Sequence, residues 1–76
     1  MKKSIYQIFA EVFEIPIAKV NDKLSKSSFE QWDSIMHLTL ISEVELEYDI
    51  SFEPEEIEKI DTLKDLITSS ALKTQV

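Results

Sequence analysis

Hydrophobic residues recur at helical spacing near the start of the chain. They occupy the i, i+3, i+4, i+7 and i+8 positions that form one face of an amphipathic helix: Ile5, Ile8, Phe9, Val12 and Phe13. Ser4 and Gln7 make a capping-box pattern at the start, and Pro16 disfavours helical angles at the residue before it. The pattern predicts a helix over about residues 4–14.

A second helix is predicted over about residues 34–48. Asp33 is a good N-cap residue, and the helix shows an expected core stripe, with Leu40 beside it: Leu38, Ile41, Val44 and Tyr48. A second row lies on another side: Ile35, Thr39, Ser42 and Leu46. We expect this row to face solvent as a contact surface; alternatively, Ile35 and Leu46 pack under the loop or a neighbouring short helix.

The remaining segments predict a loop and two further helices. Residues 15–33 show no sustained period, and so long a loop should pack against the helices because unstructured connections of this length are uncommon in compact domains. Pro54 suits the first position of a short helix over about 54–60. Thr62 and Asp65 open a last helix over about 62–72, and the tail beyond Ala71 is expected to fray.

No strand pattern competes with these helices. We therefore predict one all-α domain over residues 1–76, a small bundle of three main helices plus one short helix. Seventy-six residues leave no room for a second lobe. The chain shows neither a signal-peptide pattern nor the roughly 20 apolar residues that span a bilayer. We expect a cytoplasmic protein without membrane insertion.

The charge is strongly acidic and unevenly distributed. Fifteen acidic residues against eight lysines give a formal net charge of -7, which disfavours nucleic acid as a partner. No lysine lies between Lys26 and Lys59, whereas ten acids do: Glu30, Asp33, Glu43, Glu45, Glu47, Asp49, Glu53, Glu55, Glu56 and Glu58. This block is either a solvated surface or a docking face for basic partners.

Several kinds of chemistry lack the residues they need. Without glycine there is no Gly-rich phosphate loop and no GxSxG nucleophile elbow. Without cysteine, and with His37 as the one histidine, there is no thiolate nucleophile and no histidine-based zinc site. A small hydrolase using Ser34 and His37 is one alternative, but the pair lacks an orienting acid and an oxyanion donor.

Ser34 lies in the first turn of the second helix. Unpaired N–H groups and the helix dipole stabilise a phosphate attached there; alternatively, the Asp33–Ser34 pair only caps the helix. His37 falls near the centre of the core stripe by helical angle. It is expected to be neutral and satisfied by water or a loop carbonyl, or else to be a polar contact near whatever Ser34 carries. Trp32 either fixes the loop against the bundle or lies beside the carried group.

The stretch WDSIMHL, residues 32–38, resembles the Asp-Ser-Leu motif of acyl carrier proteins, with Ile35 in place of leucine. The family pattern continues through LISEVELEYDISFEPEEIEKIDTLKDLI, and the resemblance covers the whole chain. It implies an acyl-carrier-like fold and a covalent 4'-phosphopantetheine arm on Ser34, next to Asp33. The thiol of this arm would hold acyl or aminoacyl groups as thioesters.

The resemblance also implies partners and a docking helix. A phosphopantetheinyl transferase would attach the arm, and a loading enzyme and a downstream transferase or synthase would use it. The helix after Ser34 would meet these partners, with the protein acting as a monomeric carrier and not as an enzyme. The expected docking residues are Ile35, Thr39, Glu43, Glu45, Leu46 and Glu47.

Two departures from the family pattern favour a dedicated carrier of a specialised pathway. Fatty-acid carriers usually have Gly-Ala where this chain has Gln31-Trp32, and acids where it has Thr39 and Leu46. The identity of the cargo stays open. It also stays open whether the core can house a long acyl tail among its expected large residues: Phe9, Phe13, Phe29 and Leu38. The alternative function is an unmodified interaction module that docks basic partners through its acidic face.

Overall fold

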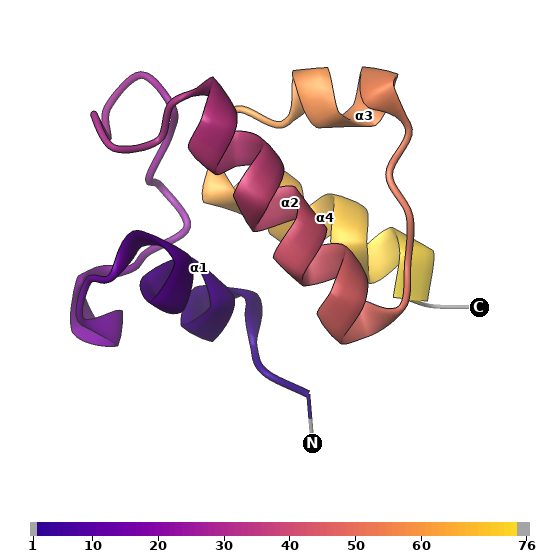
Figure 1. Cartoon of the computed structure of the whole chain (residues 1–76), viewed down its shortest axis with the longest axis horizontal. Coiled ribbons are helices and arrows are strands. Elements are labelled where there is room, and N and C mark those ends of the chain that lie inside the picture. The colour runs from indigo at the N-terminus through magenta and orange to yellow at the C-terminus, as the bar shows by residue number, and fades with distance from the viewer. Residues whose placement is uncertain (1, 75–76) are drawn as a thin grey trace.

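The computed structural model describes residues 2–74 as a bundle of four α-helices and one 3-10 turn. The elements are α1 (Ile5–Phe13), η1 (Ile17–Lys19), α2 (Ser34–Tyr48), α3 (Pro54–Lys59) and α4 (Leu63–Thr74). In Figure 1, α2 runs diagonally across the middle, with α1 on one side and α3 on the other. The predicted all-α fold of three main helices and one short helix is confirmed.

Both α1 and α2 end through a residue in the left-handed conformation. Glu14 (φ 56°) follows α1 and Asp49 (φ 55°) follows α2. After each, a half-buried isoleucine, Ile15 or Ile50, donates its N–H to a carbonyl five residues back, at 3.0 Å and 3.2 Å. This is the geometry that glycine usually supplies at helix ends, so Pro16 is not alone in ending α1.

The core is formed by all the long helices together with Trp32 and the residues that flank α3. Its fully buried side chains come from several elements: Phe9, Trp32, Leu40, Ile41, Val44, Ile60, Leu63 and Leu66. Helices α2 and α4 both contribute to this cluster, so the buried residues of α2 define the face that it turns toward the core.

The expected core position of Leu38 is wrong. Leu38 is 56% exposed, whereas Leu40 is fully buried. The inward line of α2 runs through His37, Leu40, Ile41 and Val44, at i, i+3, i+4 and i+7. A polar residue opens this line, so a stripe traced through apolar residues alone began one position too late.

The segment between α1 and α2 is held to the start of α4. Lys26 donates its N–H to the Asp61 carbonyl (2.9 Å), and Leu63 donates to the Leu24 carbonyl (2.9 Å). Ser25 pairs with Thr62 in an isolated antiparallel bridge. These bonds satisfy backbone groups that a packed loop cannot leave to water, and they bring the loop beside the first turn of α2.

The short helix α3 has no buried residue and rests on the bundle through the half-buried Ile57 and through polar contacts. Pro54 opens it, and the Glu53 and Glu56 side chains form a reciprocal cap. Lys73 of α4 pairs with Glu56 at 2.8 Å and lies over the Phe52 ring. The expected fraying beyond Ala71 is wrong for Leu72, Lys73 and Thr74, which α4 includes; residues 75 and 76 lie outside the described part.

Over residues 2–74, the structure contains no helix with the length and apolar character needed to cross a membrane.

Candidate functional site

Asp33 and Ser34 form the beginning of α2. Asp33 is extended, and its Oδ1 accepts the Met36 N–H at 2.9 Å as a side-chain cap. Ser34 is the first helical residue, is exposed, and its hydroxyl makes no hydrogen bond to another group within residues 2–74. The Ser34 hydroxyl is therefore accessible to a second molecule.

The first turn of α2 also offers unpaired N–H donors beside Ser34. Asp33 takes the Met36 N–H, and its carbonyl takes the His37 N–H at 2.8 Å. The N–H groups of Ser34 and Ile35 have no acceptor within the described part of the chain. Free N–H groups and the dipole of a 15-residue helix favour a phosphate attached to Ser34.

A surface pocket of about 290 Å³ opens beside Ser34. It lies between the start of α2, the end of α3 and the loop, and its walls are formed by Lys26, Ser34, His37, Leu38, Ile57 and Glu58. Lys26 provides a cation for an anionic group, and Leu38 and Ile57 provide apolar surface. These residues fit a phosphate followed by a flexible, partly apolar chain.

His37 forms the inner wall of this pocket and is only 6% exposed. Its Nδ1 accepts the Trp32 Nε1–H at 2.9 Å, so the Nε2 of the neutral ring carries the proton and donates to the Ile57 carbonyl at 2.8 Å. His37 is satisfied as expected, but by a side chain and a carbonyl of α3. Neither nitrogen is free to accept the Ser34 proton, which removes the basis of the hydrolase alternative.

Trp32 fixes the loop against the bundle. Its side chain is 2% exposed and packs edge-on against Phe9, with ring centroids 5.3 Å apart, and against Phe13, at 6.2 Å. Phe29 completes the group at 5.7 Å from Phe9. Of the two roles considered for Trp32, its position supports the structural one.

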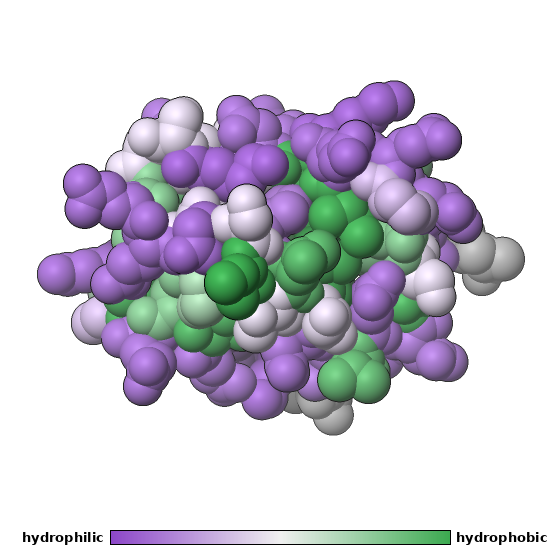
Figure 2. All heavy atoms as spheres, turned by 45° about the horizontal axis from the view of Figure 1, so that its top comes forward, coloured by the Kyte–Doolittle hydropathy of each residue, from purple (hydrophilic) through white to green (hydrophobic). Residues whose placement is uncertain are grey.

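The second row of α2 faces solvent, as expected. Ile35 and Leu46 are 76% and 78% exposed, and Thr39 and Ser42 are exposed as well. The alternative in which Ile35 and Leu46 pack under a neighbouring segment is wrong. Leu38 adds a third exposed apolar side chain to this side of α2. Figure 2 shows hydrophobic side chains in the middle of one face with hydrophilic ones around them.

The acidic residues of α2 differ in their surroundings. Glu43 is exposed. Glu45 is half-buried and accepts the Phe52 N–H at 2.7 Å, and Glu47 is half-buried and accepts the Lys3 N–H at 3.0 Å. The carboxylates of Glu45 and Glu47 thus also join segments of the protein, so Glu43 is the most accessible of the three.

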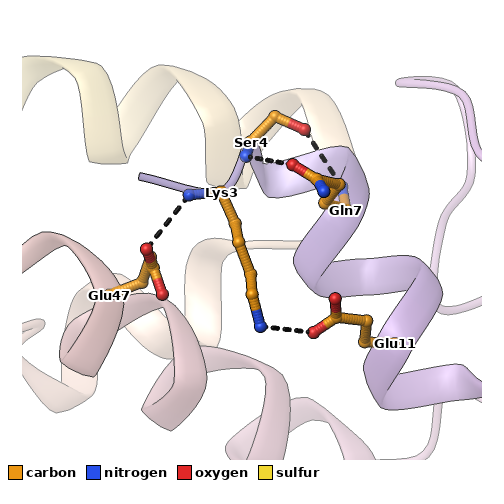
Figure 3. Close-up of polar contacts among 5 residues, drawn as sticks. All are labelled: Lys3, Ser4, Gln7, Glu11 and Glu47. Carbon is orange, nitrogen blue, oxygen red and sulfur yellow. Dashed lines mark hydrogen bonds and ion pairs between the residues drawn. The ribbon is translucent and has the colours of Figure 1, made fainter. Parts of the chain in front are cut away.

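Lys3 moderates the acidic surface between α1 and α2 (Figure 3). Its Nζ pairs with Glu11 at 2.7 Å while its backbone N–H contacts Glu47. The hydrogen bond and charge of Glu11 raise the pKa of the Lys3 ammonium, with further contributions from Glu47 and Glu43. Lys3 therefore stays charged and partly neutralises this surface.

Sequence reasoning missed three of the residues that line the pocket. Lys26 lies eight residues before Ser34, and Ile57 and Glu58 lie more than twenty residues after it. No local pattern marks these three residues as neighbours of Ser34. They meet Ser34 only because the loop is tied to α4 and His37 is tied to α3. Trp32 and His37 lie five residues apart, and this spacing is not one at which residues share a face of a helix or a strand.

A comparison with protein families finds a match. The family described as "Phosphopantetheine attachment site" matches residues 3–69. A comparison with curated proteins finds no match.

Proposed function

Because the chain belongs to the phosphopantetheine-attachment-site family, whose members carry covalent 4'-phosphopantetheine, we propose that Ser34 is its attachment residue. The family identifies a carrier protein and confirms the expected resemblance. The observation that carries the assignment is an exposed hydroxyl without an internal partner, at the first position of α2 and on the wall of a pocket.

The residues around Ser34 have distinct roles in this proposal. Asp33 holds the first turn of α2 through the Met36 N–H. The N–H groups of Ser34 and Ile35 stabilise the phosphate, and Lys26 adds positive charge. The Ser34 oxygen attacks the phosphorus that bears the pantetheine group of coenzyme A, the phosphoanhydride bond breaks, and adenosine 3',5'-bisphosphate leaves. The Ser34 proton passes to a base of the phosphopantetheinyl transferase, since both nitrogens of His37 are engaged.

When bound, the arm supplies a thiol that holds acyl or aminoacyl groups as thioesters. The chain itself has no cysteine, so its contribution is to hold the attachment point and to be recognised. Its partners in this proposal are the transferase, a loading enzyme and a downstream transferase or synthase.

The proposed docking face is the outward side of α2. Ile35, Thr39 and Leu46 supply a mixed apolar surface, and Glu43, Glu45 and Glu47 supply negative charge for basic residues of a partner. Glu43 is the most available acid, because Glu45 and Glu47 also make internal bonds. The two large exposed apolar groups support a carrier dedicated to a specialised pathway.

Intact-mass measurement tests the attachment. After incubation with coenzyme A and a phosphopantetheinyl transferase, we expect the protein to gain the mass of one phosphopantetheine group. Ser34→Ala should gain nothing, and the matched variant Ser42→Ala, at another exposed serine of α2, should be modified like the natural chain. A wild-type chain that stays unmodified would support the interaction module instead.

A further inference from the structure

Trp32, His37 and Ile57 form a continuous polar bridge across the base of the pocket beside Ser34. The two hydrogen bonds, at 2.9 Å and 2.8 Å, join the loop, α2 and α3. We infer that this bridge closes the bundle below Ser34, so that the cargo stays in the surface pocket and is a short acyl or aminoacyl group. The inference rests on the proposed function.

An aromatic wall lies behind the bridge. The Trp32 ring contacts Phe9 and Phe13, and Phe13 contacts Phe29 at 5.4 Å between ring centroids. Trp32 and Phe9 are 2% and 0% exposed. A chain entering from the pocket would have to displace His37 first and then these rings.

The core between α2 and α4 is also filled. Leu40, Leu63 and Leu66 are fully buried, and Ile60 is 1% exposed. Protein interiors at this level of burial are close-packed, so an inserted hydrocarbon chain needs side chains to move. Opening a path between α2 and α3 would also break the bond from His37 to the Ile57 carbonyl.

A second, apolar pocket of about 300 Å³ lies at the opposite end of α2, where Tyr48 and Ile67 line it. It cannot serve cargo on Ser34 through the interior, because Ser34 and Tyr48 are the two ends of α2. At 1.5 Å per residue they are separated by roughly 21 Å of packed helix.

The pocket beside Ser34 suits a short cargo. Its volume of about 290 Å³ falls just below the roughly 300–1,000 Å³ typical of small-molecule pockets. Leu38 and Ile57 can cover a short apolar group, while Lys26 and Glu58 can meet polar or charged ends. A long hydrocarbon would extend into water.

A chemically tethered chain tests this closure without any transferase. The natural chain has no cysteine, so Ser34→Cys introduces a unique thiol that iodoacetamides alkylate. N-methyl and N-octyl derivatives are compared by their amide chemical shifts and by their urea midpoints. We expect the shifts of the Leu40 and Leu63 amides, and the midpoints, to be the same for both derivatives.

Shifted Leu40 or Leu63 amides, or a higher midpoint for the octyl derivative, would overturn the inference. Adding His37→Ala to Ser34→Cys should open the route, so that the octyl derivative then has the higher midpoint of the two. If the double variant folds and its octyl derivative shows no higher midpoint, the role of His37 is overturned. If the double variant does not fold, the comparison of the two Ser34→Cys derivatives with His37 intact still tests the closure. A missing phosphopantetheine mass gain would overturn only the proposed function.

Discussion

The substitution His37→Ala tests the bridge between the loop, α2 and α3 most directly. It leaves the buried Trp32 Nε1–H without its acceptor, and an unsatisfied buried donor costs about 1–3 kcal/mol. The Ile57 carbonyl is only half-buried and can turn to water, so losing its bond should cost about 1 kcal/mol. We expect His37→Ala to lower the free energy of unfolding by about 2–4 kcal/mol.

This is a large share of the total, because a chain of 76 residues has an expected free energy of unfolding of about 4–11 kcal/mol. The partner variant is Trp32→Phe, which keeps an aromatic ring and removes the N–H donor. Because this variant has no tryptophan fluorescence, unfolding in urea is followed by circular dichroism at 222 nm. The double variant His37→Ala/Trp32→Phe should lose about 1–2 kcal/mol less stability than the sum of the losses in the two single variants.

Additivity of the two substitutions within about 0.5 kcal/mol would refute this reasoning, because it would mean that the Trp32–His37 hydrogen bond contributes nothing. The slope of the urea transition should be unchanged, since the area exposed on unfolding stays similar. The matched control His37→Gln keeps a polar side chain on the pocket wall and should lose less stability than His37→Ala.

Three further outcomes follow from other parts of the structure. Leu46→Glu should reduce loading by the cognate enzyme about tenfold, equal to about 1.4 kcal/mol, because it puts a charge on the exposed apolar row. Leu72→Glu, at another exposed leucine on α4, should not reduce loading. The N–H groups of Asp61 and Thr62 lower the pKa of the Asp65 carboxyl, so its contribution is present above its unfolded pKa of about 4 and is lost as the pH falls through the folded value. Asp65→Ala removes the acceptor of the Asp61 and Thr62 N–H groups and, because the carboxyl is exposed, should lower the free energy of unfolding by only about 0.5 kcal/mol at pH 7. A loss of the same size at pH 2 would contradict this. Glu14→Gly should raise the free energy of unfolding by about 0.5–1 kcal/mol, because Glu14 is left-handed (φ 56°); an equal rise in Glu14→Ala would show that the backbone conformation is not the cause.

Local sequence patterns were sufficient for most of the fold. The capping pattern of Ser4 and Gln7 is present in the structure, as is the Asp33 cap that places Ser34 in the first turn of α2. These features depend on residues three or four positions apart, which lie together in any helix. The outward row with Ile35 and Leu46 followed from the same geometry.

The parts that sequence could not supply depend on distant contacts. His37 is buried because Trp32 and Ile57 satisfy its ring, five and twenty residues away. Helical angle puts His37 near the centre of the core stripe, but apolar periodicity alone favours Leu38, which the structure leaves exposed. The pocket beside Ser34 likewise depends on Lys26 and Glu58, whose approach is decided by tertiary packing.

The light attachment of α3 has a consequence for how this protein meets its enzymes. None of its six residues is buried, and Lys73–Glu56 and His37–Ile57 are two of the contacts that hold it. Local opening free energies follow such anchoring, so amide hydrogens of α3 should exchange with deuterium well before that of Leu40. The α3 side of the pocket can then adjust to enzymes of different shape, while the Trp32–His37 bond and the packed core of α2 and α4 keep the interior closed.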